Sequence, residues 1–240
     1  MWKELLCSDA DIAAMVRPAK RLCTTGIEDL DLLLHGGLTR GSLTVITGGM
    51  GSGRSSLCYE FLRRGSSMEE AGALMTSIAK KLYEQRLPPC EFNEDEVFKG
   101  ITVSDFVSED HVEPESFSTF IDGVVKTIRS GSHKRVAVDS MEQMVEWLPE
   151  SAVAMGMRRI QEAAFDEDVT VVITCGMAST AELQAADCVL ALGMKPVGPD
   201  AMRTMEVLRC RGGMQPLSVY VLSFGKEGAM LTRLMEGSDE

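Results

Sequence analysis

The stretch that most constrains the fold is residues 43–62, LTVITGGMGSGRSSLCYEFL. An apolar, β-branched run predicts a buried strand, and Leu57, Phe61 and Leu62 have the spacing of one helix face. The segment between them has the spacing G-x-x-x-x-G-[KR]-S. A strand, a glycine-rich loop and a helix in this order are typical of a loop that wraps around a phosphate group.

The residue types of the loop explain why it can hold an anion. Glycines permit backbone conformations that other residues resist, so the chain can approach a phosphate closely. The loop N–H groups and the start of the next helix supply partial positive charge. Ser55 has the position of a Mg²⁺ ligand. We therefore predict nucleotide phosphate binding by Gly48, Gly49, Met50, Gly51, Ser52, Gly53, Arg54, Ser55 and Ser56.

One position departs from the pattern, because Arg54 stands where lysine is usual. Arginine keeps the positive charge but carries it on a wide planar group. Phosphate binding is expected to survive, whereas close contact with a γ-phosphate stays open. The alternative for the whole loop is a glycine-rich turn that binds no ligand.

The composition limits the classes of fold and function that this chain can have. With 240 residues, 45% of them hydrophobic, the chain can bury the core of one large α/β domain. The net charge of −12 argues against a general nucleic-acid surface. Seven cysteines form no C-x-x-C pair, which predicts reduced core thiols and no zinc site. No stretch reaches transmembrane length, and we expect a cytoplasmic protein.

Residues 25–57 resemble the start of the ATPase core in the KaiC-like branch of the RecA superfamily. The family pattern is T-G-I-x-x-L-D-x-L-L-x-G-G-L-x-x-G, followed by a strand and the phosphate loop. Within it we expect Thr25 to cap a short helix and Gly36 with Gly37 to end that helix. The resemblance, together with alternating apolar strands and helices, implies a three-layer α/β RecA-like P-loop core with a mostly parallel sheet.

Further landmarks follow in order. The strand at 134–140 ends in Asp139, which would hold Mg²⁺ through water opposite Ser55. The apolar strand at 168–174 ends in Thr174, where the family senses the γ-phosphate. Asp187 lies in a segment like the family's A-D-x-V-x-x-L strand, and its role is either structural or functional.

The end of the strand at 71–78 carries the main departure from the family. Active members have a pair of glutamates there, and one of them orients the attacking water. This chain has Ala79 and Lys80, and the next acid, Glu84, falls a turn into the following helix. A carboxylate is needed to polarise water beside the γ-phosphate, so we expect slow or absent hydrolysis and assign no catalytic residue.

The last third predicts an antiparallel extension with strands at 204–211, 217–224 and 229–234. Arg209 and Arg211 flank Cys210 and therefore share one strand face. They match the family's K-x-R-G segment, which in ring-forming relatives reaches the nucleotide of the adjacent subunit. A solvated edge strand is the alternative. The resemblance thus implies a homo-oligomeric ring, a hexamer being one option.

Three parts of the chain are expected. Residues 1–22 form an N-terminal helix and linker, either a strap on the domain or a contact with a neighbouring subunit. Residues 23–235 form a RecA/KaiC-like ATP-binding domain, and 236–240 form a disordered tail. The acidic stretch between 87 and 116 fits a solvated face better than a partner site.

The leading hypothesis is a protein that binds ATP with Mg²⁺, lets the nucleotide control assembly, and hydrolyses little or none. The missing glutamates, the single core and the run at 98–103 most resemble the ATP-binding component of the archaellum motor, which docks on a motor ATPase. The alternatives are an active ATPase or autokinase, a recombinase-like DNA-binding ATPase, and a scaffold without nucleotide. The biological process and the choice between ATP and GTP stay open.

Overall fold

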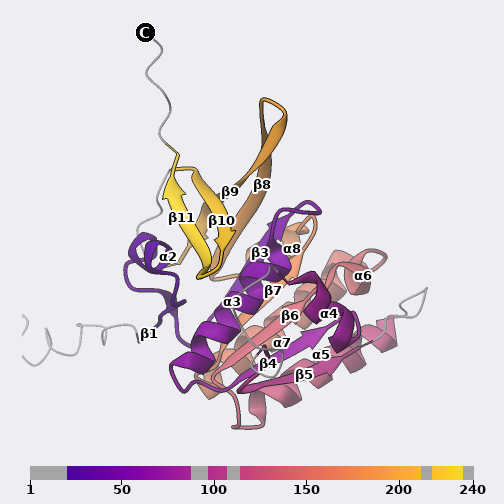
Figure 1. Ribbon diagram of the computed structural model, residues 1–240. Helices are drawn as coiled ribbons and strands as arrows, with labels where there is room; N and C mark the ends of the chain where they lie inside the picture. Colours follow the sequence, from indigo (N-terminus) through magenta and orange to yellow (C-terminus); the bar gives the residue numbers. More distant parts are fainter. Residues whose placement is uncertain (1–20, 88–96, 107–113, 212–217, 235–240) are drawn as a thin grey trace, which may run out of the picture.

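The computed structural model describes residues 21–87, 97–106, 114–211 and 218–234 (Figure 1). The expected N-terminal helix at 1–22, apart from its last two residues, and the tail at 236–240 lie outside these ranges. The strands are β1 (Leu22–Cys23), β2 (Leu38–Thr39), β3 (Leu43–Gly48), β4 (Gly72–Thr76), β5 (Ile101–Asp105), β6 (Arg135–Asp139), β7 (Thr170–Cys175), β8 (Cys188–Val197), β9 (Asp200–Cys210), β10 (Tyr220–Gly225) and β11 (Gly228–Arg233). The helices are α2 (Glu28–Leu33), α3 (Arg54–Ser67), α4 (Lys80–Arg86), α5 (Pro114–Arg129), α6 (Glu142–Val145), α7 (Glu150–Glu167) and α8 (Thr180–Ala185).

A nine-stranded sheet of described residues organises the molecule, in the order β11-β10-β9-β8-β3-β7-β6-β4-β5. The strands from β8 to β5 in this order are parallel, and Ile46 of β3 is in register with Thr174 of β7 and Leu190 of β8. Every residue of β4, β6 and β7 is buried. Strands covered on both faces have this continuous apolar character.

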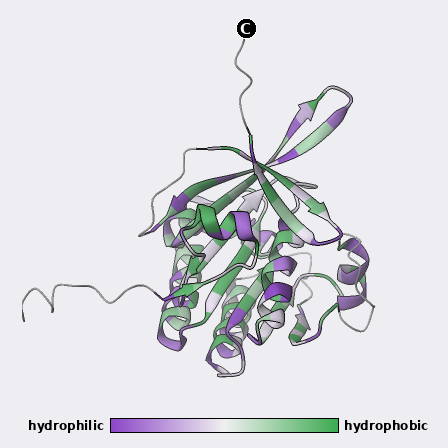
Figure 2. Ribbon diagram, turned by 60° about the vertical axis from the view of Figure 1, so that its left-hand side comes forward, coloured by the Kyte–Doolittle hydropathy of each residue, from purple (hydrophilic) through white to green (hydrophobic). Residues whose placement is uncertain are grey.

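Two apolar cores cover the two faces of this sheet. One combines residues of α2, α3 and the β10–β11 hairpin, including Leu57, Phe61 and Leu222. The other combines α5, α7 and α8, including Ile121, Met157 and Ala181. In Figure 2 the apolar colour runs along the strands, while the helices alternate between apolar and polar. This layering is the predicted three-layer α/β fold.

The antiparallel extension is also confirmed. Beyond its parallel part, β8 continues into a long hairpin with β9, and β10 and β11 complete the edge (Figure 1). A register shift between Val189 and Leu190 marks an irregularity in the β8–β9 pair. No helix within the described ranges is both long enough and apolar enough to cross a membrane.

One local expectation is wrong. Thr25 does not cap α2, because the residue at the cap position is Ile27 and it makes no side-chain cap. The carboxylate of Asp31 instead reaches back and accepts hydrogen bonds from Thr25 N at 2.6 Å and Gly26 N at 3.0 Å. The turn before the helix is therefore stabilised by an acid from inside it. The helix does end before Gly36 and Gly37, as predicted.

Candidate functional site

The glycine-rich loop joins the carboxyl end of β3 to the start of α3, as the sequence predicts. Gly48 has φ of 156°, and a Cβ there would lie 2.4 Å from the carbonyl oxygen of Leu192. Gly53, the residue before α3, has φ of 98°, and a Cβ there would lie 2.7 Å from a ring carbon of Phe224. Both positions therefore require glycine for backbone conformation and for close packing.

Several hydrogen-bond donors of the glycine-rich loop have no partner among the described residues. Among the described residues, no hydrogen bond uses the backbone N–H of Gly51, Gly53, Arg54 or Ser55. The hydroxyl of Ser52 is buried and has no hydrogen-bond partner within the same ranges. Buried polar groups are normally paired, so these groups indicate a polar ligand such as an anion. Arg203 of β9 donates from Nε to Gly51 O at 2.8 Å and ties the loop to the hairpin.

A second set of polar residues lies at the carboxyl ends of β6 and β7. Asp139 is only 6% exposed and accepts a hydrogen bond from the Thr174 hydroxyl. The Tyr83 hydroxyl of α4 donates to the carbonyl oxygen of Ser55 at 3.2 Å. Burial raises the pKa of Tyr83 well above its usual value, and the negative charge of Asp139 adds to the rise. Residues Ser55, Asp139 and Thr174 thus belong to one region of the sheet edge.

Arg54 has a partner that the sequence did not identify. Its Nη1 lies 3.2 Å from Oε2 of Glu142, a residue of α6 directly beyond β6. The Glu142 carboxylate covers Gly176, where a Cβ would lie 1.9 Å from Oε1. Gly176 in turn accepts a hydrogen bond from Gly48 N at 3.0 Å. The Glu142 carboxylate therefore lies against Gly176, whose carbonyl oxygen binds the first residue of the glycine-rich loop.

A further acid lies buried beside this pair. Glu182 of α8 accepts from Ser179 N at 2.6 Å, while its Oε1 has no partner in the described part of the chain. Burial raises the pKa of this carboxyl, and the charge of Glu142 contributes in the same direction. Burial likewise raises the pKa of the nearby Cys175 thiol to about 12. The thiol is therefore neutral at ordinary pH and unsuited to act as a nucleophile.

The end of β4 offers no acid. Ala79 precedes α4 as its cap residue, and Lys80 directs its ammonium toward Phe98, 5.0 Å from the ring centroid. This contact has the geometry of a cation–π interaction. Ala79 and Lys80 thus offer a methyl group and a cation that contacts Phe98, and neither offers a carboxylate.

Arg209 and Arg211 lie at the opposite edge of the sheet from the glycine-rich loop, since Cys210 pairs with Cys188 at the start of β8. Both donate to the end of α8, Arg209 to Leu183 O and Arg211 to Gln184 O. They share one face, as expected. The structure does not bring them near the loop of their own chain.

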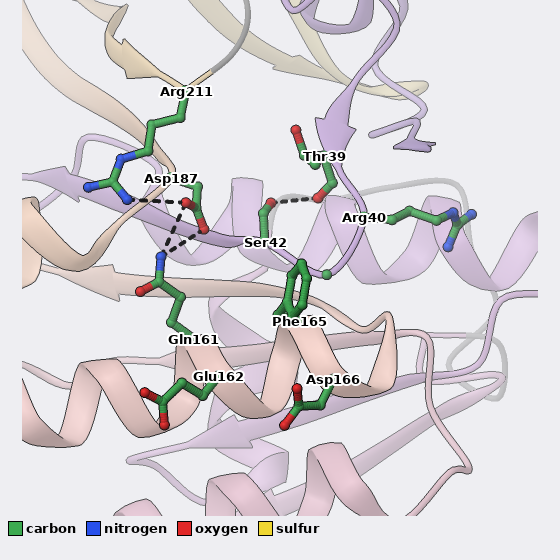
Figure 3. Close-up of a pocket in the computed structure, with 10 residues that line it drawn as sticks. Thr39, Arg40, Ser42, Gln161, Glu162, Phe165, Asp166, Asp187 and Arg211 are labelled. Carbon is green, nitrogen blue, oxygen red and sulfur yellow. Dashed lines mark hydrogen bonds and ion pairs between the residues drawn. The ribbon is translucent and has the colours of Figure 1, made fainter. Parts of the chain in front are cut away.

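A cavity of about 600 Å³ opens beside Arg211 at this edge, between the chain before β3 and the end of α7 (Figure 3). Figure 3 shows Asp187 between Gln161 and Arg211, and Arg211 Nη1 lies 3.5 Å from the Asp187 carboxylate. The same carboxylate accepts from Leu43 N at 3.0 Å. Asp187 therefore has a structural role at the start of β3.

The structure thus brings together the loop, Asp139 and Thr174, and separates Arg209 and Arg211 from them. Sequence reasoning missed Tyr83, Glu142 and Arg203. The unusual Arg54 was the one available signal, because a guanidinium enclosed near a sheet edge calls for an acidic partner.

Comparisons with known proteins agree with this geometry. A family model described as the KaiC ATPase matches residues 23–235. The circadian clock protein KaiC2 of Synechocystis sp. is 27% identical over 229 residues, covering 86% of this chain and 39% of that protein. A UPF0273 protein of Aeropyrum pernix is 25% identical over 209 residues, covering 78% of this chain and 84% of the relative. The chain thus spans about two-fifths of the length of KaiC2.

Among solved structures, a KaiC-like protein of Pyrococcus horikoshii matches with a TM-score of 0.75. The match covers 89% of this chain and 99% of the other, at 18% sequence identity. At this identity the likeness establishes the fold.

Proposed function

The chain belongs to the KaiC family of ATPases, and we propose that it binds ATP with Mg²⁺ and uses the bound nucleotide to control its assembly, with little or no hydrolysis. One observation carries the proposal: within the described ranges, amide donors of the glycine-rich loop and the buried Ser52 hydroxyl have no partner, and they lie at the sheet edge that also holds Asp139. Ligands bind at this edge of open α/β sheets.

The residues present fit the nucleotide and its metal. The phosphates would be held by the loop from Gly48 to Ser56, and Mg²⁺ by Ser55 and Asp139. Within the described ranges no cluster of three or more His, Cys, Asp or Glu side chains could hold a metal. Mg²⁺ in nucleotide sites keeps several waters and takes one or two carboxylates plus phosphate oxygens, so Ser55 and Asp139 would be enough protein ligands. Bound Mg²⁺ would neutralise phosphate charge, while Thr174 would orient Asp139.

The prediction of little hydrolysis depends on what replaces the family's glutamate pair. Ala79 has no group that could polarise water, and Lys80 points toward Phe98. A positioned base contributes about 10²–10⁴-fold to such a step. We therefore infer that the protein responds to the binding of ATP and does not depend on its hydrolysis.

The assembly that we propose rests on the position of the two arginines. Arg209 and Arg211 lie at the edge away from the loop of their own chain, which supports a role toward the phosphates of a neighbouring copy. A nucleotide that binds better to the assembled form stabilises that form. A homo-oligomeric ring is the arrangement we propose. A motor ATPase as partner, and with it the archaellum role, stays a prediction.

Equilibrium titration with a fluorescent ATP analogue, with Mg²⁺ and with EDTA, tests the central proposal. We expect saturable binding that is tighter with Mg²⁺, and phosphate release at background level. Absence of binding would instead indicate a scaffold. Phosphate release that rises with protein concentration and disappears in Asp139→Ala would establish an active ATPase. Salt-sensitive binding of single-stranded DNA would favour the recombinase-like alternative.

A further inference from the structure

We propose that Glu142 competes with the nucleotide phosphates for Arg54, so that the ion pair between them, here called the Arg54–Glu142 latch, must open for a triphosphate to bind with full affinity. The inference rests on the proposed nucleotide function and adds a residue that controls affinity at the same site. Glu142 is a positioning residue in this scheme, because it acts through Arg54.

The geometry of the pair supports the competition. Arg54 is the first residue of α3, directly after the glycine-rich loop, and its Nη1 lies 3.2 Å from Glu142 Oε2. The Arg54 side chain is 13% exposed and that of Glu142 is 49% exposed. The guanidinium is therefore enclosed, and the carboxylate approaches it from the solvent side. The contact is made by Nη1, but carboxylate and phosphate oxygens bind the same type of donor, and the ion pair holds the Arg54 side chain toward α6. The two anions therefore compete for the direction in which the guanidinium lies.

The position of Glu142 places its charge beside Gly176, a residue that is hydrogen-bonded to the strand and loop of the candidate site. Its carboxylate covers Gly176, whose carbonyl oxygen accepts hydrogen bonds from Gly48 N and from the Thr47 hydroxyl, each at 3.0 Å. The buried Glu182 lies near enough for the Glu142 charge to affect it. A glycine at 176 is what leaves room for the carboxylate, since a Cβ there would lie 1.9 Å from Oε1.

The chemistry of arginine explains why such a latch suits this chain. A lysine is a compact, strongly hydrated charge that can move aside, whereas an arginine offers a planar set of donors that matches one carboxylate. The half-exposed acid limits the strength of the pair to the range of surface ion pairs. Removing the competing carboxylate should therefore tighten triphosphate binding by about two- to fivefold.

The experiment is a titration of the full chain with the fluorescent ATP analogue in EDTA and in Mg²⁺. The variants are Glu142→Gln, Arg54→Ala and the double variant, with Glu146→Gln as the control that removes the same charge from the same segment. We expect Glu142→Gln to tighten binding, Glu146→Gln to leave it unchanged, and the Glu142→Gln effect to vanish in the Arg54→Ala background. Gly176→Ala is an independent variant, because its methyl group would push the Glu142 carboxylate away and should also tighten binding.

The outcomes separate the two proposals. Binding by the wild type with unchanged affinity in Glu142→Gln overturns the latch and leaves the proposed function standing. If Glu142→Gln tightens nucleotide binding by the same factor in the Arg54→Ala background, Glu142 repels the phosphates directly. That result also overturns the latch. If neither the wild type nor any variant binds the analogue while thermal unfolding shows all of them folded, the proposed function fails and the latch fails with it.

Discussion

At the scale of single residues, Glu182 should make folding stability depend on pH. Burial raises the pKa of its carboxyl above the ordinary value of 4.5. An acid with a higher pKa in the folded state binds its proton more strongly there, so its contribution to stability is greatest below the unfolded pKa and falls as the pH rises through the folded pKa. We expect the free energy of unfolding of the wild type, relative to Glu182→Gln, to decrease with rising pH above about 4.5.

Urea unfolding of both proteins between about pH 4.5 and 8 measures this difference. Glutamine retains an oxygen that can accept from Ser179 N, so the turn before α8 is preserved. Parallel pH profiles for the two proteins would contradict the raised pKa.

Asp139 gives the second prediction at this scale. If it holds Mg²⁺ with Ser55, Asp139→Asn should reduce the Mg²⁺-dependent gain in affinity for the ATP analogue by about tenfold, because a charged ligand is replaced by a neutral one. Asparagine can still accept from the Thr174 hydroxyl, which protects the fold. Asp122→Asn, on the exposed face of α5, is the matched control and should behave as the wild type. If the affinities measured with Mg²⁺ and with EDTA differ by the same factor in Asp139→Asn as in the wild type, Asp139 is not a Mg²⁺ ligand.

At the scale of elements, the register of β8 and β9 can be tested with their cysteines. Cys188 and Cys210 are direct partners, and Arg211 N donates to Asp187 O at 2.8 Å beside them. The pair is therefore of the type without hydrogen bonds between its own residues, in which Cα atoms are about 4.5 Å apart. That separation permits a disulfide. Both side chains pack in the same core.

We expect a thiol-specific oxidant such as diamide to join Cys188 and Cys210 within one chain, with loss of two thiols and reduction of the diamide. Peptide mass spectrometry after proteolysis without reductant identifies the linked peptides. Cys188→Ser should abolish that peptide and leave the remaining thiols titratable. A cross-link of Cys210 to another cysteine in the wild type would contradict the register.

The elements also show what could be predicted from the sequence. The strand at 170–175 was predictable because its residues are apolar without alternation, and a strand buried on both faces requires that pattern. The strand expected at 204–211 begins earlier, since β9 covers Asp200–Cys210. The helix cap expected from Thr25 is not formed. The Thr25 hydroxyl instead donates to the carboxylate of Asp31, six residues later. Local patterns therefore located the elements better than their ends.

The candidate site was predictable only in part, for a related reason. The glycine-rich loop, Asp139 and Thr174 each follow a recognisable strand, so their common edge could be expected, although their roles stay predictions. The contact between Arg54 and Glu142 joins residues 88 positions apart. It depends on the order β3-β7-β6 in the sheet, which no local pattern in one sequence reveals.

At the scale of the whole molecule, the two edges of the sheet carry different chemistry. The carboxyl edge holds the glycine-rich loop and Asp139, and the other edge holds Arg209, Arg211 and the cavity beside Asp187. If the loop holds a nucleotide, its phosphates place negative charge at one edge, while Arg209 and Arg211 lie at the other. This arrangement suits a heterologous contact, in which one copy meets the next with a different surface. A contact of this kind closes into a ring when its rotation permits.

Assembly should therefore respond to nucleotide, and Arg211 should transmit the response. In the single chain its side chain is 47% exposed and donates to Gln184 O at 2.8 Å. In sedimentation velocity runs we expect Mg²⁺ with a slowly hydrolysed ATP analogue to shift the wild type toward a larger species. A nucleotide at 100 times its Kd favours the form that binds it by about 2.7 kcal/mol per site. Arg211→Ala should bind the nucleotide but lose most of this shift, whereas Lys126→Ala, at an exposed position of α5, should keep it. Two results would contradict this prediction: a wild-type sedimentation coefficient that does not change with nucleotide, and an Arg211→Ala protein that assembles as the wild type does. Either result would indicate that the arginines only stabilise the end of α8.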